Sequence, residues 1–154
     1  MLGLGWDLEP LRRPDRLDVL YTSPVELQMD TIVEELLRRA EENRVCRVVI
    51  DALGDLGKAA ADERRFSDYI YALTQEFAAR KVTSLLLLEA PGDLHGGRLE
   101  TGREVSYMSD NIVVLSMDLE RELRRTIRIV KTRGSAHDGG RHVMHIGPSG
   151  MQVD

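Results

Sequence analysis

The feature that most constrains this chain is an apolar, largely β-branched run that ends in a carboxylate, residues 44–51 (RVCRVVID). Such a run is typical of a strand buried on both faces, with Cys46 inside it and Asp51 presented where the strand leaves the sheet. An open α/β sheet places ligand-facing residues at that edge, and in nucleotide hydrolases such an acid holds Mg²⁺ as the Walker B Asp. A purely structural interpretation of Asp51, as the polar end of a buried strand, is equally open.

The composition fits one globular domain with a real core, since 42% of the 154 residues are hydrophobic. The longest apolar runs have the length of strands, and the start lacks a basic segment before an apolar stretch, so we expect neither a membrane span nor a secretory signal. The single Cys46 allows no internal disulfide and indicates an intracellular, cytoplasmic setting. The formal net charge of -5 argues against bulk nucleic-acid binding.

The N-terminal part of the chain alternates between strand and helix patterns. We predict a first strand at residues 17–21, a helix after Asp30, a helix over residues 62–81, and a buried strand at residues 84–89 that again ends in an acid, Glu89. Residues 23–26 (SPVE) have the spacing of a capping box, and Asp30 is a second candidate N-cap, after which the stronger helix pattern follows. The apolar stripes are Ile32, Val33, Leu36, Leu37 and Ala40 in the first helix and Phe66, Ile70, Leu73 and Phe77 in the second. This order predicts a right-handed parallel α/β sheet.

Two glycine-containing segments are expected to be loops. In the first, Gly57-Lys58 invites comparison with the phosphate-binding loop G-x-x-x-x-G-K-[ST], but Ala52 stands where the motif needs glycine and Ala59 where it needs a hydroxyl. We therefore reject a phosphate-binding loop there. The second, residues 91–107, is rich in glycine and charge, and we expect a flexible surface loop. A functional loop and a tolerated insertion both remain open.

Residues 108–154 have the pattern of antiparallel strands. The predicted hairpin and closing strands are residues 111–118, 125–133, 141–146 and 151–153. Alternation along a strand points Lys131 and Arg133 the same way at the strand end, where Gly134 lets the backbone turn tightly. Two converging cations indicate an anion such as phosphate. An edge strand protected by Lys and Arg is the open alternative.

Metal and nucleophile chemistry receive little support from the sequence. His142 and His145 lie an odd number of positions apart on a strand, so we expect them on opposite faces, and no Cys or His partner stands at ligand spacing. The sequence contains neither a G-x-S-x-G segment nor a Cys/His pair that would indicate a nucleophilic enzyme.

Five features follow one another along the chain in an informative order: residues 5–8 (GWDL), residues 48–51 (VVID), Glu89, residues 109–111 (SDN) and residues 131–138 (KTRGSAHD). Together they resemble the KaiC-like ATPases of the RecA superfamily, over nearly the whole chain. The specific parts are the Lys-x-Arg-Gly-Ser-x-His and Gly-Trp-Asp-Leu elements, because a Walker B strand alone would not identify the family.

The resemblance implies an α/β, RecA-like (P-loop NTPase) fold. Its partly parallel sheet is flanked by helices and carries a C-terminal antiparallel β-hairpin extension, and the N-terminal P-loop strand is missing. Residues 1–154 would form a single truncated domain, with an α/β part (1–90), a flexible loop (91–107) and antiparallel strands (108–154). In the family, the phosphate loop and a strand ending in the catalytic Glu precede the Gly-Trp-Asp-Leu element, where this chain begins.

The resemblance also implies rings of subunits that hold ATP and Mg²⁺ between neighbours. By that analogy Asp51 supports Mg²⁺, and Glu89 is a catalytic sensor on the γ-phosphate side. Lys131 and Arg133 would reach in trans to the phosphates of the adjacent subunit's nucleotide, and His137 would reach toward its sugar.

Two functions of different class follow from these observations. In the first, the chain is part of an ATPase whose activity needs the absent segment. In the second, it is a degenerate, non-catalytic KaiC-like module that binds or regulates through protein association, as a homo-oligomer or with an intact KaiC-like protein. Ala52 also departs from the Ser or Thr that usually follows the Walker B Asp.

A sheet that lacks two strands would leave unpaired backbone groups, each costing roughly 1 to 3 kcal/mol when buried. We therefore expect the remaining strands to close up into one continuous sheet. Residues 17–21 would lie beside the Asp51 strand, and the Glu89 strand beside residues 112–117. Strand addition by another chain is the alternative, and a homo-oligomeric contact would cover the remaining apolar surface.

Overall fold

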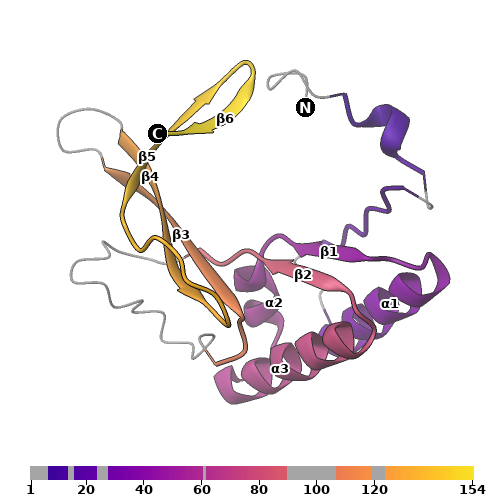
Figure 1. Ribbon diagram of the computed structural model, residues 1–154. Helices are drawn as coiled ribbons and strands as arrows, with labels where there is room; N and C mark the ends of the chain where they lie inside the picture. Colours follow the sequence, from indigo (N-terminus) through magenta and orange to yellow (C-terminus); the bar gives the residue numbers. More distant parts are fainter. Residues whose placement is uncertain (1–6, 14–15, 24–27, 61, 90–106, 119–123) are drawn as a thin grey trace. The chain divides into compact units, whose positions relative to one another are not determined.

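The computed structural model describes residues 7–13, 16–23, 28–60, 62–89, 107–118 and 124–154 (Figure 1). The chain divides into two compact units: an α/β unit, Leu11–Val105, and a β unit, Met1–Pro10 with Ser106–Asp154. A 3-10 helix, Glu9–Leu11, lies near the N-terminus. The predicted loop at residues 91–107 lies outside the described residues except for Tyr107. The organisation as a single domain stays a prediction.

The α/β unit alternates between helices and strands as the sequence predicts. Its elements are α1 (Met29–Glu42), β1 (Arg47–Ile50), α2 (Leu53–Ala59), α3 (Glu63–Ala79) and β2 (Thr83–Leu86), and β1 pairs with β2 in parallel. α3 begins after Asp62, whose carboxylate accepts the Arg65 amide at 2.7 Å. The predicted N-cap Asp30 is wrong, because α1 begins after Gln28. Asp30 lies in the first turn, where an acid also suits the helix dipole.

The core of the α/β unit lies between the two long helices and one face of the strand pair. α1 contributes Ala40, β1 contributes Val48, and α3 contributes Leu73 and the fully buried Phe77. Both helices lie on the same side of β1 and β2 in Figure 1. The partly buried residues packed against this cluster include Val33, Leu36 and Leu37. The apolar stripes predicted for both helices are therefore confirmed.

β1 and β2 are buried on one face only, so the prediction of strands buried on both faces is wrong. Val49 and Leu85 are register partners, and 62% and 59% of their surfaces are exposed. Cys46 is also exposed, and it precedes β1. The reason is that α1 and α3 both cover the face that carries Val48, whereas no described residue buries the opposite face.

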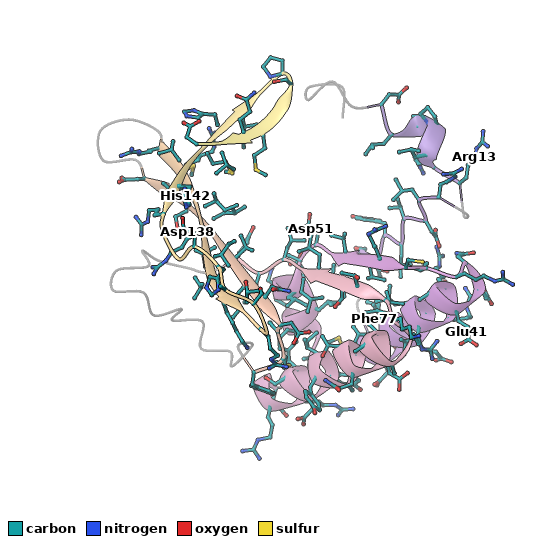
Figure 2. The ribbon with its side chains drawn as sticks, in the orientation of Figure 1. Arg13, Glu41, Asp51, Phe77, Asp138 and His142 are labelled. Carbon is teal, nitrogen blue, oxygen red and sulfur yellow. The ribbon has the colours of Figure 1, made fainter. Side chains whose placement is uncertain are left out.

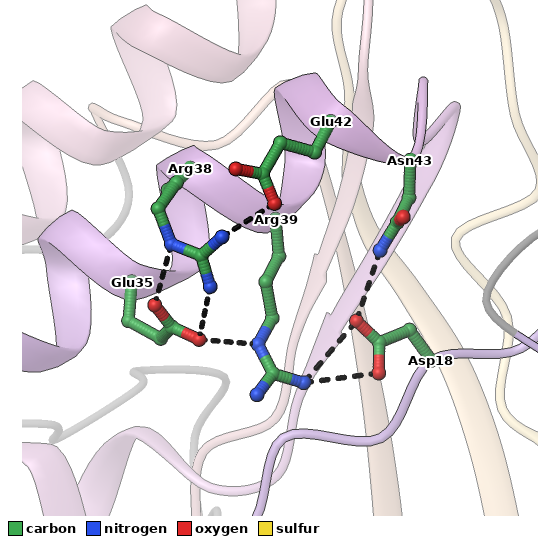
Figure 3. A network of polar contacts seen from close by, with 6 residues as sticks. All are labelled: Asp18, Glu35, Arg38, Arg39, Glu42 and Asn43. Atoms are coloured by element: carbon green, nitrogen blue, oxygen red, sulfur yellow. Dashed lines mark hydrogen bonds and ion pairs between the residues drawn. The ribbon is translucent and has the colours of Figure 1, made fainter.

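The predicted strand at residues 17–21 is not formed. The amide of Leu17 donates to the Arg13 carbonyl oxygen at 2.8 Å, as part of a turn. The carboxylate of Asp18 accepts hydrogen bonds from Arg39 at 3.0 Å and from Asn43 at 3.1 Å (Figure 3). Side-chain contacts with α1 therefore hold this segment, and strand pairing does not.

Glu35 sits at the centre of the charged network on α1 (Figure 3). It accepts hydrogen bonds from Arg38 at 2.8 Å and from Arg39, which lower the pKa of the Glu35 carboxyl, Arg39 most strongly. Arg38 also bonds Glu42. A shallow pocket beside this network is lined by Leu20, Thr22, Gln28, Thr31, Ile32 and Glu35. Because these charges are accessible to solvent, the network adds little to stability.

The β unit is an antiparallel sheet in the order β3 (Asn111–Asp118), β4 (Arg124–Thr132), β5 (His142–Gly147) and β6 (Gly150–Val153). The predicted hairpin and closing strands are therefore confirmed. Gly134 follows β4 with a φ of 80° and Gly150 opens β6 with a φ of 102°, conformations that glycine adopts without strain.

The β3–β4 register assigns alternate residues to the two faces of the hairpin. Leu115 of β3 lies opposite Ile127 of β4 on one face, and Ser116 lies opposite Thr126 on the other. The apolar row of β3, which consists of Val113, Leu115 and Met117, is exposed. A register irregularity lies between Ile112 and Val113, next to the strand end that carries Lys131.

The described strands form two separate sheets, β1-β2 and β3-β4-β5-β6, so the expected single continuous sheet is wrong. The parallel pair is covered by helices on one face, and the strands of the second sheet follow one another as an antiparallel meander. Within the described residues, no helix has both the length and the apolar character that crossing a membrane requires.

Replacing Phe77 by alanine should destabilise the α/β unit strongly, because the ring is fully buried between α3 and the strands. We expect a loss of about 3–5 kcal/mol in the free energy of unfolding, measured by urea denaturation. Gln75→Ala, at an exposed position of α3, is the matched control and should change it by less than about 0.5 kcal/mol. Equal effects of both changes would contradict this account of the core.

Candidate functional site

Asp51 and Glu89 lie at the carboxyl edge of the parallel strand pair. Asp51 directly follows β1, and Glu89 lies three residues beyond β2. The Leu87 amide donates to the Ile50 carbonyl oxygen at 3.0 Å, and the Leu53 amide donates to the Leu87 carbonyl oxygen at 2.9 Å. Because the strands are parallel, both exposed carboxylates belong to the same edge; Figure 2 labels Asp51 there.

α2 adds an ion pair to this edge. Lys58 Nζ lies 2.7 Å from Asp55 Oδ1, one turn along the helix. This hydrogen bond raises the pKa of the Lys58 ammonium, and the charge of Glu89 contributes further in the same direction. The prediction of a loop directly after Asp51 is wrong, because this segment is mostly the helix α2. Lys58 lies in the last turn of that helix. Its position agrees with the rejection of a phosphate-binding loop.

The donor chemistry of Asp51 fits a magnesium ion. Mg²⁺ is usually held by one or two carboxylates together with waters and substrate phosphates, so an exposed carboxylate at a sheet edge is an adequate protein contribution. Across the part of the chain that the structure describes, no group of three or more His, Cys, Asp or Glu side chains could hold a metal ion by itself. A magnesium site here would therefore depend on a nucleotide's phosphates.

Lys131 and Arg133 both contact the segment that precedes β3. The ammonium of Lys131 donates to the Ser109 carbonyl oxygen at 2.7 Å. The guanidinium of Arg133 lies 3.0 Å from the carboxylate of Asp110, and the Arg133 amide donates to the Asp110 carbonyl oxygen at 2.8 Å. Ser109 and Asp110 belong to a segment that the family resemblance singled out, but the sequence alone did not predict their contacts with the cations.

The turn that carries His137 is fixed by its neighbour Asp138. This carboxylate accepts the Gly140 amide at 2.7 Å and lies 3.1 Å from His142 Nε2 (Figure 2). The Gly140 amide is the main cause that lowers the pKa of the Asp138 carboxyl, followed by the charge of His142. Arg128 Nε donates to the Gly139 carbonyl oxygen at 2.8 Å and anchors the same turn to β4. Asp138 and His142 were not predicted as partners.

The candidate residues thus form two groups, one in each unit. The α/β unit carries Asp51 and Glu89, and the β unit carries Lys131, Arg133 and His137. Each group lies within one unit, and its side chains are exposed to solvent, except for Lys131, which is partly buried. His145, predicted on the face opposite His142, lies 3.0 Å from the Asp154 carboxylate.

The helices, the parallel pair that ends in acids, and the antiparallel extension define an α/β protein with the RecA-like fold. The solved structure of a KaiC-like protein from Pyrococcus horikoshii matches 99% of this chain with a TM-score of 0.81; the 23% sequence identity makes this a likeness of fold. The chain belongs to the KaiC ATPase family, whose model, described as "ATPase: KaiC", matches residues 1–154. The predicted family and fold class are therefore confirmed.

The chain is also similar to curated cyanobacterial proteins. It is 26% identical over 98% of its length to the circadian clock protein KaiC3 of Synechocystis sp.. It is 29% identical over 99% of its length to the circadian clock oscillator protein KaiC of Acaryochloris marina. The chain spans 30% of the length of each of these relatives and 66% of the Pyrococcus horikoshii protein.

The Asp138 carboxyl should titrate below its usual range in the folded chain, because the Gly140 amide and His142 stabilise its charged form. Its contribution to stability should be present above pH about 4 and lost as the pH falls through the lowered value. NMR titration of the side chain measures this. His142→Ala should reduce the shift without abolishing it, since the Gly140 amide remains. Titration at or above the ordinary value would contradict the described turn.

Proposed function

We propose that this chain contributes surfaces to ATP sites between KaiC-like subunits and does not hydrolyse ATP by itself. The observation that carries the proposal is that Lys131 and Arg133 contact the neighbouring residues Ser109 and Asp110, at one end of a sheet. Two cations at a fixed spacing suit phosphate recognition, and Arg adds directional donors to the point charge of Lys. Membership of the KaiC ATPase family supports a nucleotide as the source of that phosphate.

The chain presents its candidate groups in two local sets, which suits a role at two sites. Asp51 and Glu89 would serve the nucleotide held by this subunit, with Asp51 supporting Mg²⁺ and Glu89 sensing the γ-phosphate side. Lys131, Arg133 and His137 would serve the nucleotide of a neighbouring subunit. The bound Mg²⁺ would neutralise phosphate charge, while the residues of this chain bind and orient the phosphates.

Hydrolysis by the chain alone is not expected, because its 154 residues contain no G-x-x-x-x-G-K-[ST] motif. That motif supplies the backbone donors and the lysine that stabilise charge on the transferred phosphoryl group. Losing one such donor commonly costs roughly two to three orders of magnitude in rate. Lys58 does not replace the lysine, since it lies in α2 and pairs with Asp55.

A second candidate function is a non-catalytic KaiC-like module that acts only through protein association. The exposed apolar residues of the two sheets, such as Val49, Leu85 and Leu115, favour it, because rows of this kind often mark protein contacts. The two candidates differ in whether association depends on nucleotide. Sedimentation of the chain with and without Mg²⁺–ATP distinguishes them, since only an intersubunit nucleotide site makes association respond to ATP.

The isolated chain should show no ATP turnover above background in a phosphate-release assay. Asp51→Ala is the informative companion variant, because it removes the proposed magnesium ligand at an exposed position without disturbing the core. Turnover that copurifies with the chain and disappears in Asp51→Ala would overturn the proposal that hydrolysis is absent.

Arg133→Ala should weaken ATP-dependent association, with itself or with an intact KaiC-family protein, while leaving the fold unchanged. The Arg133–Asp110 pair is exposed, with 61% and 69% of the side chains accessible, so its loss should cost under about 1 kcal/mol of stability. Arg141→Ala, at another exposed position of the same unit, is the charge-matched control. A lowered melting temperature with unchanged association would make Arg133 structural.

A further inference from the structure

We infer that His142 is a positioning residue for the turn that carries His137, and that it holds this turn fully only while both of its ring nitrogens are protonated. The inference rests on the proposed function, in which His137 reaches toward the sugar of a neighbouring subunit's nucleotide. Neither the sequence pattern nor the family resemblance assigned a role in nucleotide binding to His142.

The two ring nitrogens of His142 both lie against hydrogen-bond acceptors. Nε2 is 3.1 Å from Oδ2 of Asp138 (Figure 2), and Nδ1 is 3.2 Å from the backbone oxygen of Asp154. A carboxylate and a backbone oxygen accept hydrogen bonds and donate none, whereas a neutral imidazole has one N–H donor and one acceptor nitrogen. Only the positively charged imidazolium donates at both nitrogens, so the observed arrangement is complete only in the charged form.

Both acceptors are held in place by contacts of their own. The second oxygen of the Asp138 carboxylate, Oδ1, accepts the Gly140 amide at 2.7 Å, and the Asp154 amide donates to the Val143 carbonyl oxygen at 3.0 Å. Gly140 also leaves the space that the carboxylate occupies, because a Cβ atom there would lie 2.9 Å from Oδ1 and 3.4 Å from Nε2 of His142. His142 therefore meets two acceptors whose positions are already fixed.

His142 attaches the turn to β5, because Asp138 directly follows His137 in the chain. The Gly139 carbonyl oxygen accepts a hydrogen bond from Arg128 Nε of β4 at 2.8 Å, so the turn contacts both strands. When His142 becomes neutral, one ring nitrogen presents a lone pair to an oxygen atom, and that hydrogen bond is lost. The attraction between the ring charge and the Asp138 carboxylate is lost in either tautomer. The attachment to β5 weakens, and His137 is held less firmly.

The direction of the pH dependence follows from these charges. Histidine side chains change charge between about pH 5 and 8. The Gly140 amide, and next the charge of His142, lower the pKa of the Asp138 carboxyl, so Asp138 stays ionised at the acid end of that range. The arrangement around His142 is therefore complete at the acid end and is lost as the pH rises.

Other charged or titratable groups lie on the adjoining segments, although Ile127, the register partner of His142 on β4, is uncharged. They are His137 and Asp138 in the turn, Arg125 and Arg128 on β4, Arg141 and His145 on the segment of His142, and Asp154 after β6. All of them are present in the native chain and in a variant of His142, so a comparison of the two isolates the effect of His142.

The test is an NMR titration of the full chain from about pH 5.5 to about pH 8, following the Gly140 amide and the Asp138 carboxyl carbon. In the native chain both signals should shift as histidine loses its charge. His142→Gln, which is neutral at every pH, should reduce both shifts roughly twofold or more, the remainder reporting His137. His145→Gln removes the histidine on the opposite face of β5 and is the matched control, which should leave both shifts unchanged.

Sedimentation with Mg²⁺–ATP at about pH 6 and about pH 8 tests the connection with nucleotide. Between these values, ATP-dependent association of the native chain should weaken about two- to fivefold more than that of His142→Gln, as expected for an exposed ion pair. The comparison with the variant is required because a terminal phosphate also titrates near pH 6.

Undiminished NMR shifts in His142→Gln would refute the inference, because the signals would then follow another group. ATP-dependent association with the same pH dependence in the native chain and in His142→Gln would refute it as well. If the NMR shifts respond as expected but association is independent of ATP at both pH values, the proposed function is wrong, and the effect of His142 on the turn is confirmed.

Discussion

The α/β unit depends on the burial of one helix face, centred on Phe77, beneath the parallel strand pair. Phe77 has no exposed surface and shares its cluster with Ala40 of α1 and Val48 of β1. Because α3 lies between β1 and β2 in the sequence and packs back onto them, the two strands can only pair in parallel. The same packing therefore directs both strand ends, and with them Asp51 and Glu89, to one edge.

The β unit is built on a different principle, in which the hydrogen-bond register of a hairpin arranges the side chains. Pairing of Asn111 with Thr132 leaves the Ser109–Asp110 turn opposite the residues that follow β4. Lys131 and Arg133 then contact oxygen atoms of Ser109 and Asp110 at the strand end. In the next turn, the Asp138 carboxylate accepts a hydrogen bond from the Gly140 amide. These contacts are exposed and energetically small, and such groups can change partners when an anion arrives.

Both sheets keep an apolar row open to solvent. Val49 and Leu85 form one in the α/β unit, and Val113, Leu115 and Met117 form the other in the β unit. Parallel sheets in α/β proteins are usually covered on both faces, so a parallel pair covered on one face is unusual. This exposed surface is the physical basis for expecting protein association, in the ATPase proposal and in its non-catalytic alternative.

The sequence by itself determined the elements whose residues repeat with a clear period, and it determined the family. The stripes of α1 and α3 and the hairpin follow from local patterns that act over a few residues, and the parallel pairing of β1 with β2 follows from the order of strand, helix and strand along the chain. The Lys-x-Arg-Gly-Ser-x-His element likewise indicated the KaiC family that the whole chain matches. Asp51 and Glu89 were found because they end strand patterns, and Lys131 and Arg133 because alternation along a predicted strand points them the same way.

Only the tertiary structure decided which apolar residues are buried and which polar groups meet. Val48 and Val49 are chemically equivalent neighbours, yet Val48 is buried and Val49 is exposed. The reason is that α1 and α3 both pack against the face of the strand pair that carries Val48. Residues 17–21 have a strand's composition, but the bonds of Asp18 with Arg39 and Asn43 join residues more than twenty positions apart. The Arg133–Asp110 contact spans a similar separation. A local pattern carries no information about such partners, since they meet only after the chain has folded.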